Sequence, residues 1–445
     1  MKKFLKVLTP LPLLAILWNG CSGGEFTSCS DCQNYETVSS KQQRDLTPNV
    51  NESTLKQLAA NNNAFAFDLF SELIKTNPEN LFFSPESISE ALAMTYAGSK
   101  GETKNEMATV LHFDMNDTLL HKSFNALDLH LNHTDANYTF NIADSLWLQK
   151  DFPLQESYLD TLKINYGADV KLVDYLHHNE EARRTINHWV EQKTHARIKN
   201  MLSKGMLVPA TKLVLVNAVY FKGKWVNEFK AYNTHKDTFY IESNKTIQTN
   251  FMEQKSSANY AETNDYQAIA LPYMGERTSM VVLLPKAGRY SYIRDNIAQL
   301  YPTLSQEMQM EAVDLKMPKF EFSTKPYALK SLFTALGMQR CFNDNEADFS
   351  GMTEKTGLYI ASIVHKAFIK VDEHGSEAAA ATAVIGEANG IIETTKQMIV
   401  NRPFLFFIKD DLSGQILFMG AIHKPVQPRI ISTNHFNSTT QGYSK

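Results

Sequence analysis

The sequence predicts one large α+β domain, in which helices cover an extensive buried β-sheet. Helical periodicity comes early: apolar residues recur on one face over residues 55–74 and again over 185–202. Strand-like apolar runs dominate later, at residues 213–221, 280–284, 404–408 and 416–422. The runs around Val214 and Phe406 are apolar on successive residues, which predicts strands that are buried on both faces.

The composition is that of a globular protein. The chain has 445 residues, of which 43% are hydrophobic and 21% are charged, so wholesale disorder and fibrous structures are excluded. Lys and Arg together number 44, and Asp and Glu number 48, for a net charge of -4. We therefore expect no general attraction to nucleic acid or anionic lipid. Since no long linker, repeat or charge block interrupts residues 48–427, we predict a single domain over that range.

The N-terminus has the layout of a secretory signal over residues 1–20. Three lysines precede an apolar run at 7–18, which is too short to span a bilayer and contains two prolines. The run ends in LWNGC, which resembles the signal of bacterial lipoproteins, although Trp18 stands where Leu is usual. That resemblance implies acylation of Cys21, with ordinary signal cleavage nearby as the alternative. We expect an exported protein, either a cell-envelope lipoprotein or extracellular, that contacts membrane only through this lipid.

Both ends of the predicted domain are polar. Residues 21–47 are rich in Ser, Asn, Gln, Asp and Gly, which predicts a linker between the anchor and the domain. Residues 428–445 are similarly polar and are predicted to form a frayed tail.

Motifs typical of enzymes are missing from the sequence. It has no Gly-x-Ser-x-Gly, no His-Glu-x-x-His, no phosphate-binding loop and no Gly-x-Gly-x-x-Gly after a strand. The Cys29 and Cys32 pair lies in the predicted linker without further soft ligands nearby, so a zinc or redox site is not favoured. We therefore predict a protein that is not an enzyme and uses neither metal nor cofactor.

The segment from Glu373 to Gly386 has two possible conformations. By propensity it predicts a helix, because Ser376 can cap it and four alanines follow. Read with a period of two, one side carries only small or uncharged residues, whereas Glu377 and Glu387 fall on the other side. Such a segment could be exposed in one state and form a strand over an apolar core in another, because nothing large or charged would be buried.

Short segments in a fixed order along the chain carry a family resemblance. They are NLFFSPESI (80–88), TINHWV (185–190), NAVYFKGKW (217–225), MPKF (317–320), DFSGM (348–352), HKA (365–367), GSEAAAAT (375–382), NRPF (401–404) and LFMG (417–420). Together they resemble the serpin family, and residues 375–382 resemble the hinge of its inhibitory branch. The chain departs from the family at Ala196, where Gly is common.

The resemblance implies a fold and a mechanism. The fold would have a large central β-sheet, further β-sheets, about eight or nine helices and an exposed reactive loop at about 373–398. As a monomer, the protein would present this loop to a target serine or cysteine protease and form a covalent acyl-enzyme. The cleaved loop would then insert into the main sheet as an extra strand and trap the protease. A non-inhibitory serpin, acting as a carrier or chaperone, is the alternative, and the alanine-rich hinge argues against it.

The resemblance also assigns roles to individual residues. The hinge would comprise Glu373, Gly375, Ser376, Glu377, Ala378, Ala379, Ala380, Ala381 and Thr382. The shutter, a hydrogen-bonded cluster beneath the sheet, would comprise Ser84, Ser87, Asn217 and His365. Trp225 would lie where the first loop residues enter the sheet, and Glu373 would pair with Lys319 there.

The reactive bond follows from the usual family distance between hinge and cleavage site. Counted from Gly375, that distance predicts cleavage between Asn389 and Gly390, which would suit an asparaginyl, legumain-like cysteine protease. Because loop lengths vary, Ala388, Ile391, Ile392 and Lys396 remain alternatives. Lys396 would suit trypsin-like enzymes, the isoleucines elastase-like or subtilisin-like ones, and Ala388 proteases with small pockets.

Overall fold

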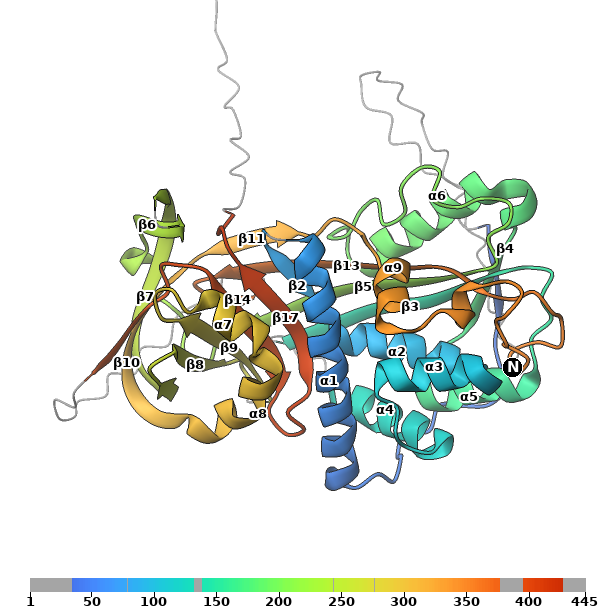
Figure 1. Ribbon diagram of the computed structural model, residues 1–445, viewed down its shortest axis with the longest axis horizontal. Coiled ribbons are helices and arrows are strands. Elements are labelled where there is room, and N and C mark those ends of the chain that lie inside the picture. Colours follow the sequence, from blue (N-terminus) through green and yellow to red (C-terminus); the bar gives the residue numbers. More distant parts are fainter. Residues whose placement is uncertain are drawn as a thin grey trace, which may run out of the picture.

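The computed structural model describes residues 34–77, 79–131, 138–242, 244–275, 277–376 and 395–426. Within these residues the chain forms two large mixed β-sheets and nine α-helices, so the predicted α+β class is confirmed (Figure 1). None of the helices in the described ranges is long and apolar enough to span a membrane.

The first sheet carries the site. Its strands lie in the order β1 (Glu36–Val38), β4 (Val170–Val173), β3 (Tyr138–Gln149), β5 (Leu213–Lys224), β14 (Gly375–Ser376), β13 (Ile360–Asp372) and β11 (Phe320–Ser323), with β12 (Tyr327–Ala328) also beside β13. Alternate residues of β5 are buried in two different hydrophobic clusters: Leu215 and Val219 in the main core, Val214 and Val216 in the other. The prediction that this strand is buried on both faces is therefore confirmed.

The second sheet packs on the first through aromatic side chains. Its order is β15 (Lys396–Ile399), β10 (Gln309–Pro318), β7 (Lys245–Glu262), β8 (Tyr266–Pro272), β9 (Thr278–Pro285), β16 (Phe404–Asp410), β17 (Ile416–Ile422) and β2 (Leu81–Phe83), with β6 (His235–Glu242) beside β7. Phe82 stacks on Phe406 and Phe418, and Phe221 of the first sheet contacts Phe418. These rings hold the two sheets together at the core.

Helices cover both faces of the first sheet, and α1 and α8 also contact strands of the second sheet. They are α1 (Glu52–Thr76), α2 (Pro85–Tyr96), α3 (Gly101–Leu111), α4 (Asp117–Leu131), α5 (Glu156–Tyr166), α6 (Tyr175–Lys193), α7 (Tyr290–Asp295), α8 (Ile297–Glu307) and α9 (Lys330–Leu336). In Figure 1, α6 lies above this sheet and α2 to α5 lie below it. Ser84 caps α2 by accepting a hydrogen bond from the Ser87 N–H, and Pro85 occupies the first turn. Every residue of α2 is buried, which fixes this helix beneath the sheet.

The helix predicted over 185–202 ends earlier than its apolar pattern indicates. The chain leaves the helix after Lys193, and His195 and Ala196 adopt left-handed φ angles of 48° and 61°. An alanine in this region of φ is strained, which explains why glycine suits position 196 better. Residues 198–202 still bury their apolar side chains, so the periodic pattern reflects burial and not helix.

Residues 34–47 do not form the linker that their composition predicts. Strand β1 adds to the edge of the first sheet by antiparallel pairing with β4, and the Asp45 N–H donates to the Ile164 carbonyl at 3.0 Å. Arg44 forms an ion pair with Asp128 of α4 and donates to Asn125. The polar side chains of this segment are thus engaged with α4 and α5, and composition alone cannot distinguish such a segment from a free linker. The remaining predicted linker, 21–33, lies outside the described residues.

Candidate functional site

The site is the junction between β5 and β13 in the first sheet. Over most of their length the two strands pair directly and in parallel, from Leu213 opposite Ile360 to Tyr220 opposite Phe368. At one end β14 lies between them, and it pairs antiparallel with both. The sheet is therefore closed along most of β5 and β13, and at one end it already holds two residues of the predicted loop, Gly375 and Ser376.

Gly375 fits in this position because it lacks a side chain. Its φ angle is 148°, and a Cβ atom would lie 2.0 Å from the carbonyl oxygen of Gly223 on β5. Any other residue would have to push the two strands apart. The hinge glycine is thus required by the close approach of the backbones as well as by its conformation.

Ser376 faces the protein core. Its side chain is fully buried, and its hydroxyl lies 2.7 Å from the hydroxyl of Tyr273. The Tyr273 ring stacks on the indole of Trp225, with 4.5 Å between the ring centroids. The indole Nε1 in turn donates to the carbonyl of Asp372, and the Trp225 N–H donates to the His374 carbonyl. Trp225 and Tyr273 therefore hold the chain where it turns from β13 into β14.

Glu373 is held by two partners near the same turn. Lys319 Nζ lies 2.5 Å from one carboxylate oxygen, and the Thr234 hydroxyl donates to the other at 2.6 Å. Burial opposes ionisation of Glu373, but these two hydrogen bonds and the charge of Lys319 outweigh it and lower the pKa of the carboxyl. The structure thus brings together Glu373, Lys319 and Trp225, and adds Thr234 and Tyr273, which the sequence motifs did not single out.

The shutter residues form one hydrogen-bonded cluster beneath the closed strands. The Ser84 N–H donates to Nε2 of His365 at 3.2 Å, and Nδ1 of His365 contacts the Asn217 side-chain oxygen. Burial lowers the pKa of His365 to about 3, so the ring is neutral, with its proton on Nδ1. Asn217 donates through Nδ2 to the Ser87 hydroxyl. Asn217 lies opposite His365, so the hydrogen bond between His365 and Asn217 joins the two strands that the loop would separate.

Asp144 extends this cluster and was missed by sequence reasoning. The Ser87 hydroxyl donates to Asp144 Oδ1 at 3.0 Å, and Asn217 Nδ2 also donates to that oxygen. Asp144 on β3 lies directly opposite Asn217, so Asp144, Asn217 and His365 form a line across three adjacent strands. Burial raises the pKa of the Asp144 carboxyl well above its usual range, despite these hydrogen bonds. The available signal was the single charged residue among the twelve of β3.

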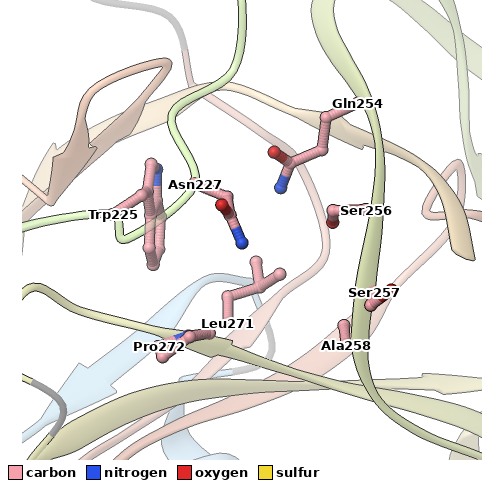
Figure 2. Close-up of a pocket in the computed structure, with 8 residues that line it drawn as sticks. All are labelled: Trp225, Asn227, Gln254, Ser256, Ser257, Ala258, Leu271 and Pro272. Atoms are coloured by element: carbon pink, nitrogen blue, oxygen red, sulfur yellow. The ribbon is translucent and has the colours of Figure 1, made fainter. Parts of the chain in front are cut away.

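A small, shallow hollow lies beside Trp225 (Figure 2). Figure 2 shows the side chains of Asn227, Gln254 and Ser256 directed into it, with Leu271 below them. All its lining residues are uncharged. The hollow therefore places neutral hydrogen-bonding groups next to the residues that hold the start of the loop.

The remaining predicted site residues fall mostly outside the described part of the chain. These are the hinge residues Glu377, Ala378, Ala379, Ala380, Ala381 and Thr382, the reactive-bond candidates Ala388, Asn389, Gly390, Ile391 and Ile392, and Cys21. Lys396 is described: it begins β15 and pairs with Val313 of β10. It therefore lies at the end of the predicted loop, in a position where strand pairing restrains the backbone.

Comparison with known proteins identifies the family. Residues 60–425 match the family model "Serpin (serine protease inhibitor)". An uncharacterized serpin-like protein of Thermococcus kodakarensis is 40% identical over 82% of this chain and 84% of its own length. The human leukocyte elastase inhibitor is 36% identical over 83% of this chain and its full length. The crystal structure of human thyroxine-binding globulin superposes with a TM-score of 0.77 at 28% identity, over 84% of this chain and all of its own. The chain belongs to the serpin family.

Proposed function

We propose that the protein is an irreversible, suicide-type inhibitor of a serine or cysteine protease. The observation that carries this proposal is β14: two loop residues already lie between β5 and β13, in antiparallel register with both strands. Because β14 already separates β5 from β13 at one end, further residues of the same segment can extend it into a full central strand as the two strands part. The family membership and the similarity to leukocyte elastase inhibitor support the same activity.

The register predicts where each inserted residue would lie. Ser376 pairs with Gly223 on one side and Val371 on the other. Six residues further along the loop, Thr382 would lie opposite Asn217 and also opposite His365. The register with β5 and the register with β13 thus place Thr382 at the same level of the sheet, as a continuous strand requires. The residues that would share the core-facing side with Ser376 are small: Ala378, Ala380 and Thr382.

The chemistry would begin with the target enzyme. Its nucleophilic oxygen or sulfur attacks the carbonyl carbon of the reactive bond, the C–N bond breaks, and the leaving amine takes a proton from the enzyme's general acid. The new chain end remains attached to the protease as an ester or thioester. Insertion of about sixteen residues as a strand would move it by roughly 54 Å. Displacement of the catalytic groups would then prevent water from hydrolysing the acyl-enzyme.

A non-inhibitory carrier is the alternative function. Thyroxine-binding globulin shares this fold, and its name states that it binds thyroxine. The fold alone therefore does not distinguish an inhibitor from a carrier. The hinge favours inhibition, because its core-facing positions are small and uncharged and its first residues already pair in the sheet. A bulky or charged hinge would instead oppose insertion.

The proposal can be tested with the full chain and a protease panel. Legumain-like, trypsin-like, elastase-like, subtilisin-like and papain-like enzymes would each be incubated with the protein, followed by denaturing gels and intact mass. We expect at least one covalent complex at the summed mass, with release of a C-terminal fragment that begins at Gly390 if Asn389 precedes the reactive bond. Clean cleavage in the loop by every enzyme, without any complex, would support the carrier alternative.

We also propose that the protein is exported and anchored through Cys21. The lysine-rich and apolar N-terminus, followed by LWNGC, supports this. Fatty-acid labelling of the wild type and of Cys21→Ala in a bacterial host tests it: label should appear only in the wild type. Equal labelling of both, or of neither, would exclude a lipid on this residue.

A further inference from the structure

Buried acidic side chains lie behind the Asp144 end of the line across the sheet. Glu86 and Glu90 are four residues apart on α2, so they share one face of that helix, and they are only 1% and 7% exposed. Asp128 of α4 is 8% exposed. Helix α2 packs directly against β3 and β5, the strands that carry Asp144 and Asn217. We call these four residues the acidic cluster: Glu86, Glu90, Asp128 and Asp144.

A cation and several neutral polar side chains surround the acidic cluster. Arg44, from the N-terminal segment, forms an ion pair with Asp128 and lowers the pKa of Glu90 in part. Tyr158 and Tyr166 of α5 are buried nearby, and His121 of α4 forms a hydrogen bond with the Tyr166 hydroxyl. His365 of β13 is connected to Asp144 through Asn217. Among the described residues, Oε2 of Glu86 is buried without any hydrogen-bond partner. Carboxylates in such surroundings are expensive to ionise.

Burial therefore favours the protonated forms. It raises the pKa values of Glu86, Glu90 and Asp144 well above their usual range, and the neighbouring acidic groups raise them further. Entry of a strand between β5 and β13 must break the bond between Asn217 and His365, which frees Asn217 to move relative to Asp144. A carboxyl that gains contact with water has a pKa closer to its ordinary value. Opening that hydrates Asp144 is therefore favoured when Asp144 is ionised.

We propose that Asp144, together with Glu86, Glu90 and Asp128 behind it, makes the opening of the sheet between β5 and β13 dependent on protonation. The sheet stays closed while Asp144 is protonated and opens more readily once Asp144 ionises. Asp144 acts as a positioning residue, because it holds Asn217 and does not itself meet the protease. The inference rests on the loop-insertion step of the proposed function and is independent of which protease is the target.

His365 works in the opposite direction and must be separated from this effect. Its pKa in the closed sheet is about 3, against an ordinary value of about 6.5. Opening that hydrates His365 would therefore be favoured by acid below about pH 6.5. This contribution is common to the wild type and to Asp144→Asn, so it cancels in the ratio of their opening rates.

The test uses a fluorescent peptide with the sequence of residues 376–386, which can enter the sheet as the missing strand without any protease. Its rate of incorporation into the full chain is measured at about pH 5.5, 7 and 8.5. In Asp144→Asn the side chain keeps its size and an accepting oxygen but cannot ionise. We expect the ratio of wild-type to Asp144→Asn rates to rise about tenfold over this range, because one unit of pKa difference between closed and opening sheets corresponds to a factor of ten.

Matched measurements keep the proposal falsifiable. Glu354→Gln removes an exposed carboxyl elsewhere and should leave the ratio to wild type constant. If Asp144→Asn fails to fold, Glu90→Gln takes its place. The ratio of wild-type to Glu90→Gln rates should then also rise with pH. A ratio independent of pH would overturn the inference, even when covalent complexes with protease form normally. Failure of the peptide to enter at any pH would instead overturn the insertion step of the proposed function, and this inference with it.

Discussion

The hydroxyl of Ser376 lies 2.7 Å from that of Tyr273, and both side chains are buried where the loop joins the first sheet. This contact places the Ser376 side chain in the core of the intact chain, at the start of the segment whose insertion we propose. It also means that the residue at position 376 must be small enough, and neutral enough, to enter the core. Burial of Ser376 in the protein's own sheet is therefore what the proposed hinge role requires at this position.

Replacement of Ser376 by Arg tests this requirement. An unpaired guanidinium at this buried site would cost several kcal/mol, so insertion should slow and most of the protein should be cleaved as a substrate. Denaturing gels would give the fraction of covalent complex, which we expect to fall at least about tenfold. Ser376→Ala, which remains small and neutral, should keep most of the complex. Equal complex yields for Ser376→Arg and the wild type would contradict the buried position of this residue during insertion.

Gly375→Ala should displace β14 from the sheet. The added Cβ would meet backbone atoms of Gly223 and Lys224, which cannot move without separating β5 from its neighbours. We expect a changed Trp225 fluorescence, because the Asp372 carbonyl that this indole binds lies just before the turn. Gly357→Ala is the matched control: Gly357 also has a positive φ, of 80°, but nothing lies within 4 Å of its added Cβ. Identical fluorescence changes in both variants would show that strain alone is responsible.

The pair between Glu373 and Lys319 should stabilise the protein in a pH-dependent way. Because the folded pKa of Glu373 lies below the ordinary value of 4.5, the contribution is present above about pH 4.5 and is lost as pH falls through the folded pKa. Lys319→Met should therefore lower the free energy of unfolding by about 1–3 kcal/mol at pH 7. Urea unfolding of both proteins at pH 7 and about pH 3 provides the measurement. A difference of the same size at both pH values would exclude an ionic origin.

Arg44→Met should show that residues 34–47 belong to the folded domain. The substitution removes the cation from a largely buried carboxyl on α4, and we expect a loss of about 1–3 kcal/mol in thermal or urea unfolding. Lys56→Met is the control, since Lys56 and Glu52 form a solvent-exposed pair on α1 that contributes little to stability. If the two variants lose equally little, the N-terminal segment contributes no more than a surface contact.

The sequence by itself determined the class of fold and four of its buried strands, β5, β9, β16 and β17. The runs around Val214 and Phe406 are apolar on successive residues, and only strands with both faces covered can bury them. The small residues after Gly375 likewise indicated a segment able to enter a core. These features are local, because periodicity and side-chain size report burial directly.

The tertiary structure decided what the pattern of single residues could not. Asp144, Asn217 and His365 lie far apart in the chain and meet only because of the register of three strands. The polar segment at 34–47 and the left-handed residues after Lys193 were misjudged for a related reason. Edge pairing and chain reversal depend on partners elsewhere in the fold, so neither composition nor periodicity reveals them. The sequence thus set which residues are buried, and the pairing of strands set which of them act together.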